Sequence, residues 1–334
     1  MEKKTVALIA CSNGYGHIRR LLLLSQALKQ SGATPVLFVP LLATEIIAKS
    51  EGITIPQIVD FDTHTNKENW LDGTSADWVK SAPSFSDFDI VISDNLIEIL
   101  LIRPDAWLSG SFFWHESLKN FPKNLKSQAL DLLKKYKPRM ISSSMFASDL
   151  VRSKVQVFEV GLYAAKNNIA IHKNKSDALI SCGKGGSSEV HAKEFVKLLV
   201  EREKTQFHRV WVEPSILPNK YPDWMSPATF TYKMYQSIIS AVIRPGVGTI
   251  TSSLLSGARI FPFYEGNNKE MEFNASRVQS YHVGESTSTI DEAWLKAELF
   301  AADENSQKRH FEEVKGLDLC GAQQSAEIIL SSVQ

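Results

Sequence analysis

The strongest constraint on the fold is an order of elements that occurs twice: an apolar strand, a glycine-rich loop and a helix. The first copy has the apolar run Val6–Ala10, the loop Ser12–His17 and helically spaced leucines from Leu21 to Leu28. The second copy starts with Asp177–Cys182 and continues through another glycine loop into a helix predicted over Glu189–Glu201. Apolar strands without alternation indicate a parallel sheet that is buried on both faces. We therefore predict an α/β fold built from two halves.

The chain length fits two domains, because 334 residues is more than twice the ~150 residues typical of one domain. The polar, lysine-rich segment Ala164–Lys175 suits a linker between the halves. We expect an N-terminal domain over 1–163, the linker over 164–175 and a C-terminal domain over 176–334, with the last helix a candidate to pack back on the first domain. Further strands are predicted at Pro35–Val39, Phe88–Ile92, Arg209–Val212, Ala241–Arg244 and Arg259–Phe263.

Net charge and cysteine usage exclude several classes of protein. The chain has 37 Lys and Arg against 37 Asp and Glu, so no global field favours nucleic acid or an anionic membrane. Cys11, Cys182 and Cys320 are widely spaced and form no C-x-x-C pattern, which argues against a zinc ribbon and a disulfide framework. We therefore expect a globular, cytoplasmic protein without a metal site.

Two segments bear on membrane contact. The most apolar stretch, Ile90–Ile102, contains Asp94 and Glu98, whereas a transmembrane helix needs ~20 nearly uncharged residues. The segment Lys119–Arg139 is rich in lysine and carries several leucines, which is typical of an amphipathic helix at the inner face of a membrane or near an anionic acceptor. The alternative, a solvated face on a helix of the core, is favoured.

The first candidate site is the glycine loop that leads into the first helix. It comprises Asn13, Gly14, Tyr15, Gly16 and His17, followed by Arg19 and Arg20. Glycines let the backbone turn sharply from strand to helix, and the helix N-terminus favours an anion. An imidazole with a near-neutral pKa can accept a proton from an attacking hydroxyl or water. The alternative is an ordinary tight turn, and a dinucleotide fingerprint fits poorly because Arg19 occupies the third glycine position.

The second candidate site lies at a later junction of strand and helix. Glycines there permit close approach of the backbone, and hydroxyls open the helix, as in a cradle for a diphosphate. The polar loop that follows the next strand adds acidic and amide groups. The candidate binding residues are Arg244, Gly246, Val247, Gly248, Thr249, Ser252, Glu265, Asn268, Glu270 and Asn274.

The order of these motifs resembles a known family. Arg-Pro-Gly-x-Gly-Thr from Arg244, the run Gly257–Phe263 and the Asn274-Ala275 pair look like the nucleotide-sugar-binding half of GT-B glycosyltransferases, in the branch of the bacterial lipid-intermediate N-acetylglucosaminyltransferase. The N-terminal Gly-x-Gly-His loop is similar to the acceptor-side loop of the same enzymes. The matches span Ala7 to Gly284, mostly in the order of strands and helices.

The resemblance implies two Rossmann-like domains facing a cleft, with no obligatory metal or other cofactor. It implies that Gly246 to Thr249 contact the diphosphate, that Glu270 and Asn274 lie near the donor sugar, and that His17 is the base. By the same resemblance, the loop Gly183, Gly185, Gly186 and Ser187 closes on the phosphates or the base.

Two positions depart from the family pattern. Ser252 stands where a glutamate commonly holds the ribose hydroxyls, and a hydroxyl cannot replace a bidentate carboxylate without loss of hydrogen-bond strength. Asn268 and Glu270 stand where the donor-sugar loop usually has an Asp-Gln pair. The nucleotide and the sugar are therefore left open.

Three further residues are weaker candidates on the acceptor side. His115 and Glu116 follow aromatic residues after a predicted strand, where they could bind a sugar or serve as a second acid or base, although aromatic residues there more often belong to the core. Asp94 at a strand end suits a cleft, and helix capping is an equal alternative.

The leading hypothesis is an inverting glycosyltransferase that moves a sugar from a nucleotide diphosphate, most simply UDP, to a glycan, lipid-linked or small-molecule acceptor. The alternative is hydrolysis, because Gly14 to Arg20 also resembles the loop of the UDP-sugar hydrolase of pseudaminic acid biosynthesis. A third hypothesis is a sugar-nucleotide-binding protein without catalysis. Nucleic acid is not an expected partner, and the oligomeric state is left open.

Overall fold

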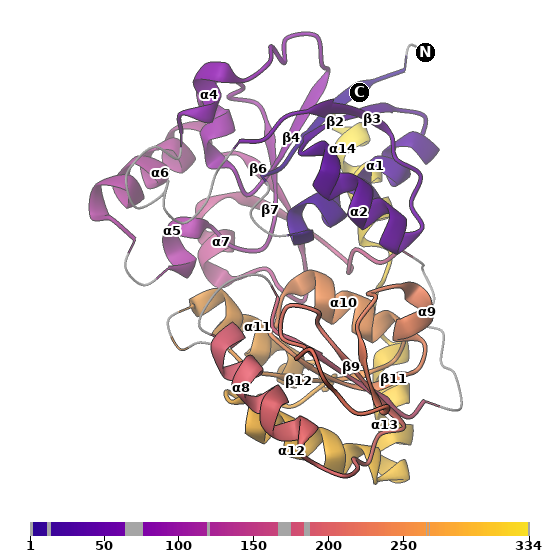
Figure 1. Ribbon diagram of the computed structural model, residues 1–334. Helices are drawn as coiled ribbons and strands as arrows, with labels where there is room; N and C mark the ends of the chain where they lie inside the picture. Colours follow the sequence, from indigo (N-terminus) through magenta and orange to yellow (C-terminus); the bar gives the residue numbers. More distant parts are fainter. Residues whose placement is uncertain are drawn as a thin grey trace. The chain divides into compact units, whose positions relative to one another are not determined.

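The computed structural model of the chain describes residues 3–11, 15–63, 76–118, 121–165, 175–183, 188–264, 266 and 268–332 (Figure 1). The chain divides into two compact units. The first unit comprises Met1–Ala165 together with Cys320–Gln334, and the second comprises Lys166–Leu319.

The first unit is built on a parallel seven-stranded sheet in the order β3-β2-β1-β4-β5-β6-β7. Its central strands β1 and β4 are almost entirely buried and mostly apolar, as expected when helices cover both faces of a sheet. The strands are β1 Thr5–Ile9, β2 Thr34–Val39, β3 Gln57–Asp60, β4 Ile90–Asp94, β5 Trp107–Ser109, β6 Arg139–Ser143 and β7 Gln156–Val160.

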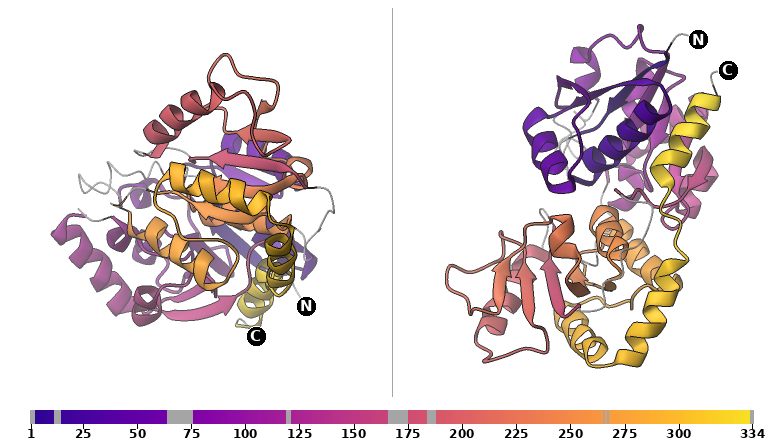
Figure 2. Two further views of the ribbon diagram at one scale, coloured as in Figure 1. Left: turned by 90° about the horizontal axis from the view of Figure 1, so that it is seen from below. Right: turned by 90° about the vertical axis from the view of Figure 1, so that its right-hand side faces the viewer.

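The helices of the first unit include one from the far end of the chain. They are α1 Tyr15–Gln30, α2 Leu41–Glu51, α4 Trp78–Ser81, the 3-10 helix η1 Ile97–Leu101, α5 Trp114–Ser117, α6 Lys123–Tyr136, α7 Asp149–Lys154 and α14 Gly321–Ser331. The helix α14, yellow in Figure 2, packs against α1 and β7. Its Ala326 and Ile329 join the leucines of α1 in one buried cluster. This packing brings residues beyond 320 into the first unit.

Close approach at Gly321 permits this packing. A Cβ atom there would lie 2.2 Å from the carbonyl oxygen of Gly161, so only glycine fits. The hydroxyls of Tyr163 and Ser325 share a buried hydrogen bond of 2.6 Å, and the Gly161 N–H donates to the Gln324 side chain at 2.8 Å. The return of the chain is therefore held by both packing and hydrogen bonds.

The second unit contains a parallel five-stranded sheet in the order β10-β9-β8-β11-β12. Its strands are β8 Asp177–Ser181, β9 Arg209–Val212, β10 Met225–Pro227, β11 Ile238–Ile243 and β12 Arg259–Pro262. Its helices are α8 Ser188–Val200, α9 Tyr232–Tyr235, α10 Val247–Leu255, α11 Lys269–Ser280, α12 Ile290–Ala301 and α13 Glu304–Lys315. The prediction of an α/β fold with parallel sheets is confirmed.

The lysine-rich segment Lys119–Arg139 is not one helix within its described part. The helix α6 ends at Tyr136, because Lys137 adopts the left-handed conformation (φ 46°), and Arg139 already opens β6. The apolar side of α6 packs on the core of the first unit through Leu133, and its lysines remain exposed. This is the arrangement of a solvated helix face.

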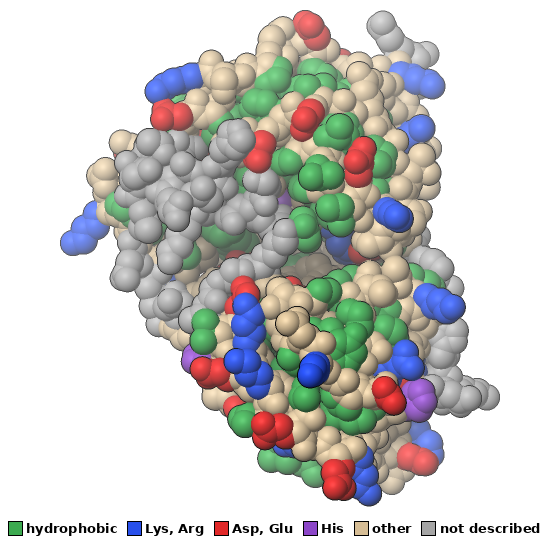
Figure 3. Space-filling view, viewed as in Figure 1, with side chains coloured by type: hydrophobic (Ala, Val, Ile, Leu, Met, Phe, Trp, Pro, Cys, Tyr) green, Lys and Arg blue, Asp and Glu red, His purple; other side chains and the backbone are tan. Residues whose placement is uncertain are grey.

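Exposed apolar side chains are also present on the first unit. Leu41, Leu42 and Ile46 of α2 are exposed, and Figure 3 shows green side chains on this face. Among the described residues, no helix is both long enough and apolar enough to span a bilayer.

Candidate functional site

A buried carboxylate organises the candidate site of the first unit. Asp94 ends β4, is fully buried, and receives four side-chain hydrogen bonds. One of its oxygens, Oδ1, lies 2.7 Å from His17 Nδ1 and accepts from Arg20 Nη2 at 2.8 Å. The other, Oδ2, accepts from Arg20 Nε at 2.6 Å and from Ser109 Oγ at 3.0 Å. Its partners are side chains rather than the main-chain N–H groups of a helix, so the capping alternative is wrong.

The sheet and the first helix bring these residues together. The strand β4 lies between β1, which leads into α1, and β5, where Ser109 pairs directly with Asp94. His17 and Arg20 are three residues apart on α1 and therefore share one helix face. The same helix buries its leucines in the core. The core packing of α1 thus fixes where both polar side chains meet the carboxylate.

The charge state of Asp94 fixes the role of each nitrogen of His17. Burial alone would raise the pKa of Asp94, but the charge and hydrogen bonds of Arg20, with the contact to His17, lower it to about 2. At neutral pH the carboxylate is therefore ionised and can only accept hydrogen bonds. Nδ1 of His17 must then donate, which in the neutral imidazole leaves Nε2 unprotonated and able to accept a proton. This is the electronic state that a general base requires.

Aromatic side chains adjoin the imidazole. The ring of Trp114 in α5 lies 5.7 Å from that of His17, centroid to centroid, and Phe112 packs edge-on against Trp114 at 4.9 Å. Both aromatic side chains are partly exposed. Sequence reasoning named the aromatic run but did not connect Trp114 with His17.

His115 and Glu116 are not joined to the Asp94 network by any interaction of the described residues. His115 is buried and stacks on the buried ring of Phe113, 5.6 Å away with an interplanar angle of 8°. Burial lowers its pKa to about 4, with a smaller contribution from the charges of Lys126 and Lys154. Its Nε2 lies 3.8 Å from Glu116 Oε1. His115 is therefore a neutral residue of the aromatic core at physiological pH.

In the second unit, the predicted glycine turn opens α10. Gly246 is the N-cap, and the first intrahelical bond runs from the Ile250 N–H to the Gly246 carbonyl at 3.0 Å. The N–H groups of Val247, Gly248 and Thr249 precede that bond, so they point from the helix N-terminus as potential donors to an anion. Ser252, further along α10, is largely buried.

Asn274 buttresses this turn from α11. It is fully buried, and its Nδ2 donates to the carbonyl of Pro245 at 2.9 Å. Its Oδ1 is buried and accepts no hydrogen bond from the described residues. Asn268 caps α11, where its side chain accepts from the N–H groups of Glu270 at 3.0 Å and Met271 at 3.3 Å. Asn274 thus holds the backbone of the turn, and Asn268 holds the first turn of α11.

The residues at the end of β8 lie next to the glycine turn that opens α10. Gly183 has a φ of 65°, and a Cβ atom there would lie 3.9 Å from Arg244 Nη1, so these two predicted residues are neighbours. The main chain at Arg244 donates to the Ser181 carbonyl at 2.8 Å. Parallel strands β8 and β11 therefore bring the two predicted motifs of this unit to one sheet edge.

Glu213 is a site residue that sequence reasoning missed. It follows β9, and its Oε2 accepts from the Ser181 hydroxyl at 2.7 Å and from the Gly183 N–H at 2.9 Å. The N–H of Gly183 is thus engaged by a carboxylate rather than free for a phosphate. The available signal was an acid directly after the short apolar strand Arg209–Val212.

The remaining predicted residues are placed as follows. Tyr15 and Gly16 are the exposed first residues of α1. Asn13, Gly14, Gly185, Gly186, Ser187 and Glu265 lie outside the described residues. Within the described part of the chain, no group of three or more His, Cys, Asp or Glu side chains could hold a metal ion.

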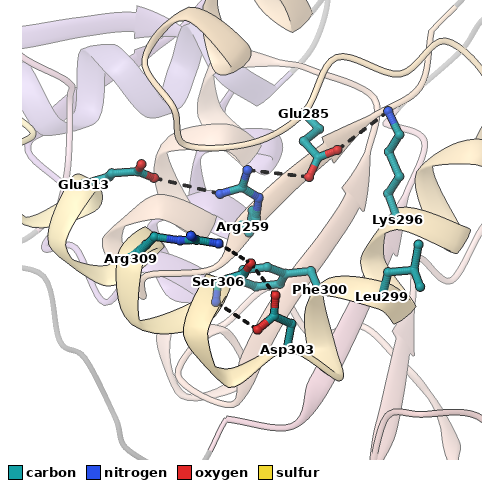
Figure 4. Close-up of a pocket in the computed structure, with 9 residues that line it drawn as sticks. All are labelled: Arg259, Glu285, Lys296, Leu299, Phe300, Asp303, Ser306, Arg309 and Glu313. Atoms are coloured by element: carbon teal, nitrogen blue, oxygen red, sulfur yellow. Dashed lines mark hydrogen bonds and ion pairs between the residues drawn. The ribbon is translucent and has the colours of Figure 1, made fainter.

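The second unit also has a cavity of about 250 Å³ that is lined by none of the candidate site residues (Figure 4). In the close-up, three acidic and three basic side chains surround it; Arg259 pairs with Glu285 (Nη2 to Oε1, 3.6 Å) and with Glu313, whereas Arg309 and Asp303 are both joined to the Ser306 hydroxyl. It is lined by Arg259, Glu285, Lys296, Leu299, Phe300, Asp303, Ser306, Arg309 and Glu313. None of them is a predicted site residue.

Comparison with solved structures identifies the fold of the chain. No protein-family model matches the chain, and no curated protein is similar in sequence. Solved structures with similar folds include LpCGTa in complex with UDP (TM-score 0.67, 15% identity), the glycotransferase of kitacinnamycin (0.66, 11%) and Arabidopsis thaliana UGT89C1 complexed with quercetin (0.66, 11%). Each comparison covers 100% of both chains. The chain therefore has the GT-B fold.

Proposed function

We propose that this protein is a glycosyltransferase that transfers a sugar from a nucleotide diphosphate to an acceptor hydroxyl. The observation that carries the proposal is the hydrogen-bonded pair of His17 and Asp94 at the carboxyl edge of a parallel sheet. The GT-B fold supports it, because the similar solved structures are glycosyltransferases. We take UDP as the nucleotide, since LpCGTa was solved with it.

In the proposed mechanism, His17 Nε2 accepts the proton of the acceptor hydroxyl while its oxygen attacks the anomeric carbon of the donor. The imidazolium that forms is stabilised by the ionised Asp94 at 2.7 Å. The bond from the anomeric carbon to the phosphate oxygen breaks, and the diphosphate leaves with the electron pair. Attack opposite to the leaving group inverts the anomeric centre.

The second unit would bind the donor. Its helix α10 presents the N–H groups of Val247, Gly248 and Thr249 ahead of the first helical hydrogen bond, and such a terminus stabilises negative charge on a leaving diphosphate. The guanidinium of Arg244, next to Gly183, would add a cation. No metal is needed in this scheme.

The acceptor would be a small molecule with a flat ring. Trp114, which adjoins the imidazole, and Phe112, which packs against Trp114, form a partly exposed aromatic surface. Aromatic faces bind planar rings and the apolar faces of sugars by stacking. A ring held there would carry its hydroxyl toward His17. The quercetin bound by UGT89C1 is a flat molecule of this class.

The test is to incubate the protein with UDP-, GDP-, TDP- and CMP-sugars and to measure the release of free nucleotide, with and without a panel of phenolic and sugar acceptors. Release that requires an acceptor supports transfer. Release by water alone identifies a hydrolase that uses the same base, and binding without release identifies a protein without catalysis. His17→Ala should abolish turnover while donor affinity is kept, with His191→Ala, exposed on α8, as the matched control.

A further inference from the structure

Arg20 makes more hydrogen bonds to the buried carboxylate of Asp94 than any other residue. It supplies two of the four hydrogen bonds to Asp94, at 2.6 and 2.8 Å, in a bidentate arrangement. Such charge-assisted, forked pairs are strong and fix orientation as well as charge. Arg20 and His17 both contact the same oxygen, Oδ1. The position and charge of that oxygen therefore depend on Arg20.

We propose that Arg20 is a positioning residue that holds Asp94 ionised against His17 and thereby selects the imidazole tautomer with its proton on Nδ1. The catalytic consequence rests on the proposed function, because only this tautomer leaves Nε2 free to take a proton. The tautomer itself is a property of the free protein. It can be measured whether or not a sugar is transferred.

The ionisation of Asp94 depends on Arg20 because the carboxylate is buried. Asp94 is fully buried, and burial opposes its ionisation, so the cation beside it must offset that penalty. Without Arg20, the pKa of Asp94 rises and the carboxyl group tends to hold a proton. A protonated carboxyl can donate to Nδ1, which moves the imidazole proton to Nε2. His17 would then present a donor where the reaction needs an acceptor.

The surroundings offer no substitute for Arg20 among the described contacts. From β5, Ser109 gives the carboxylate a neutral hydroxyl, and from α5 the ring of Trp114 faces the imidazole. Tyr163, after β7, is buried with its pKa raised to about 12, so it stays neutral. The arginine immediately before it in the sequence, Arg19, is directed elsewhere, with Nε donating to Glu51 at 2.6 Å. Arg20 is thus the cation that the structure places on Asp94.

The experiment is ¹⁵N NMR of the histidine rings in the full chain, titrated from pH 8.5 down to pH 5, in which long-range couplings distinguish Nδ1–H from Nε2–H. His17 is assigned by loss of its signals in His17→Gln. The wild-type protein should show Nδ1–H. As the pH falls, Arg20→Gln should shift the population toward Nε2–H at a higher pH than the wild-type protein does, because its carboxyl takes up a proton sooner. Arg20→Lys, which keeps the charge but not the fork, should restore part of the wild-type titration. Arg19→Gln is the matched control, because it breaks an ion pair on the same helix but not one to Asp94.

Two results would overturn the proposal: an Nε2–H tautomer in the wild-type protein, which needs no variant to fold, or identical His17 spectra in wild type and folded Arg20→Gln. If the protein turns over a nucleotide sugar, the acid limb of its kcat/KM profile should move to higher pH by about one unit or more in Arg20→Gln. Without the charge of the arginine, the hydrogen-bonded pair of Asp94 and His17 takes up a proton at higher pH, and an arginine neighbour typically shifts a carboxyl pKa by about 1–3 units. A purely structural role would lower activity without moving that limb. Failure to turn over any nucleotide sugar would refute the proposed function and leave the tautomer result unaffected.

Discussion

Replacing Lys175 with methionine should stabilise the protein. Lys175 precedes β8, is only 8% exposed, and its Nζ is buried without a hydrogen-bond partner among the described residues. An unpaired buried ammonium is costly, because burial favours the neutral amine. Burial accordingly lowers the pKa of Lys175 from 10.5 to about 7. A methionine of similar length removes the charge and keeps the packing.

The pKa values of Lys175 in the unfolded and the folded chain set the size and the pH range of the stabilisation. They differ by about 3.5 units, and each unit corresponds to about 1.4 kcal/mol. Since the folded pKa lies below the unfolded one, the penalty is absent above about pH 10.5, grows as the pH falls toward 7, and is constant below that. Near pH 7 it amounts to about 4 kcal/mol in the free energy of unfolding.

The assay is urea unfolding of wild type and Lys175→Met at several pH values between 6 and 10. The variant should gain most of that free energy at pH 6 to 7, and its advantage should shrink steadily toward pH 10. Lys220→Met, at an exposed position, should change stability by no more than about 0.5 kcal/mol at any of these pH values. Equal stability of the variant and wild type at pH 7, or an advantage that does not depend on pH, would refute the reasoning.

Three further predictions concern the site and the fold. Asp94→Asn removes the charge that stabilises the imidazolium, so kcat should fall by about 10²- to 10⁴-fold, while UDP affinity measured by calorimetry stays within twofold. Trp114→Ala should raise KM for a flat acceptor by tenfold or more and change kcat little; an unchanged KM would contradict the stacking surface. Gly321→Ala should lower Tm by at least several degrees, because its Cβ would meet the Gly161 carbonyl at 2.2 Å, and Gly316→Ala, with 3.5 Å to its nearest neighbour, should not.

The strands and glycine turns could be predicted because their signals are local. The apolar runs Val6–Ala10 and Asp177–Cys182 coincide closely with β1 and β8, and the turn at Gly246 opens α10 as expected. Each of these features depends on residues within one short stretch. Spacing and turn chemistry therefore suffice to find them.

The partners of the functional side chains could not be predicted in the same way. Asp94 was recognisable at a strand end, but its contact with His17 spans 77 residues and depends on β4 lying beside β1. Sheet order is set by packing of the whole unit rather than by any local pattern. Glu213 was missed for the same reason, since its contact with Ser181 exists only because the ends of β8 and β9 lie side by side in the sheet.

The placement of α14 has a consequence for how the chain folds as it is synthesised. The ribosome makes the sheet and α1 of the first unit early, but the helix that covers the leucines of α1 comes only after the whole second unit. The second unit can fold as soon as its own residues have emerged. The first unit must wait, with an apolar face uncovered, until residues 321–331 arrive. The unit that begins first in translation is therefore the one that is completed last.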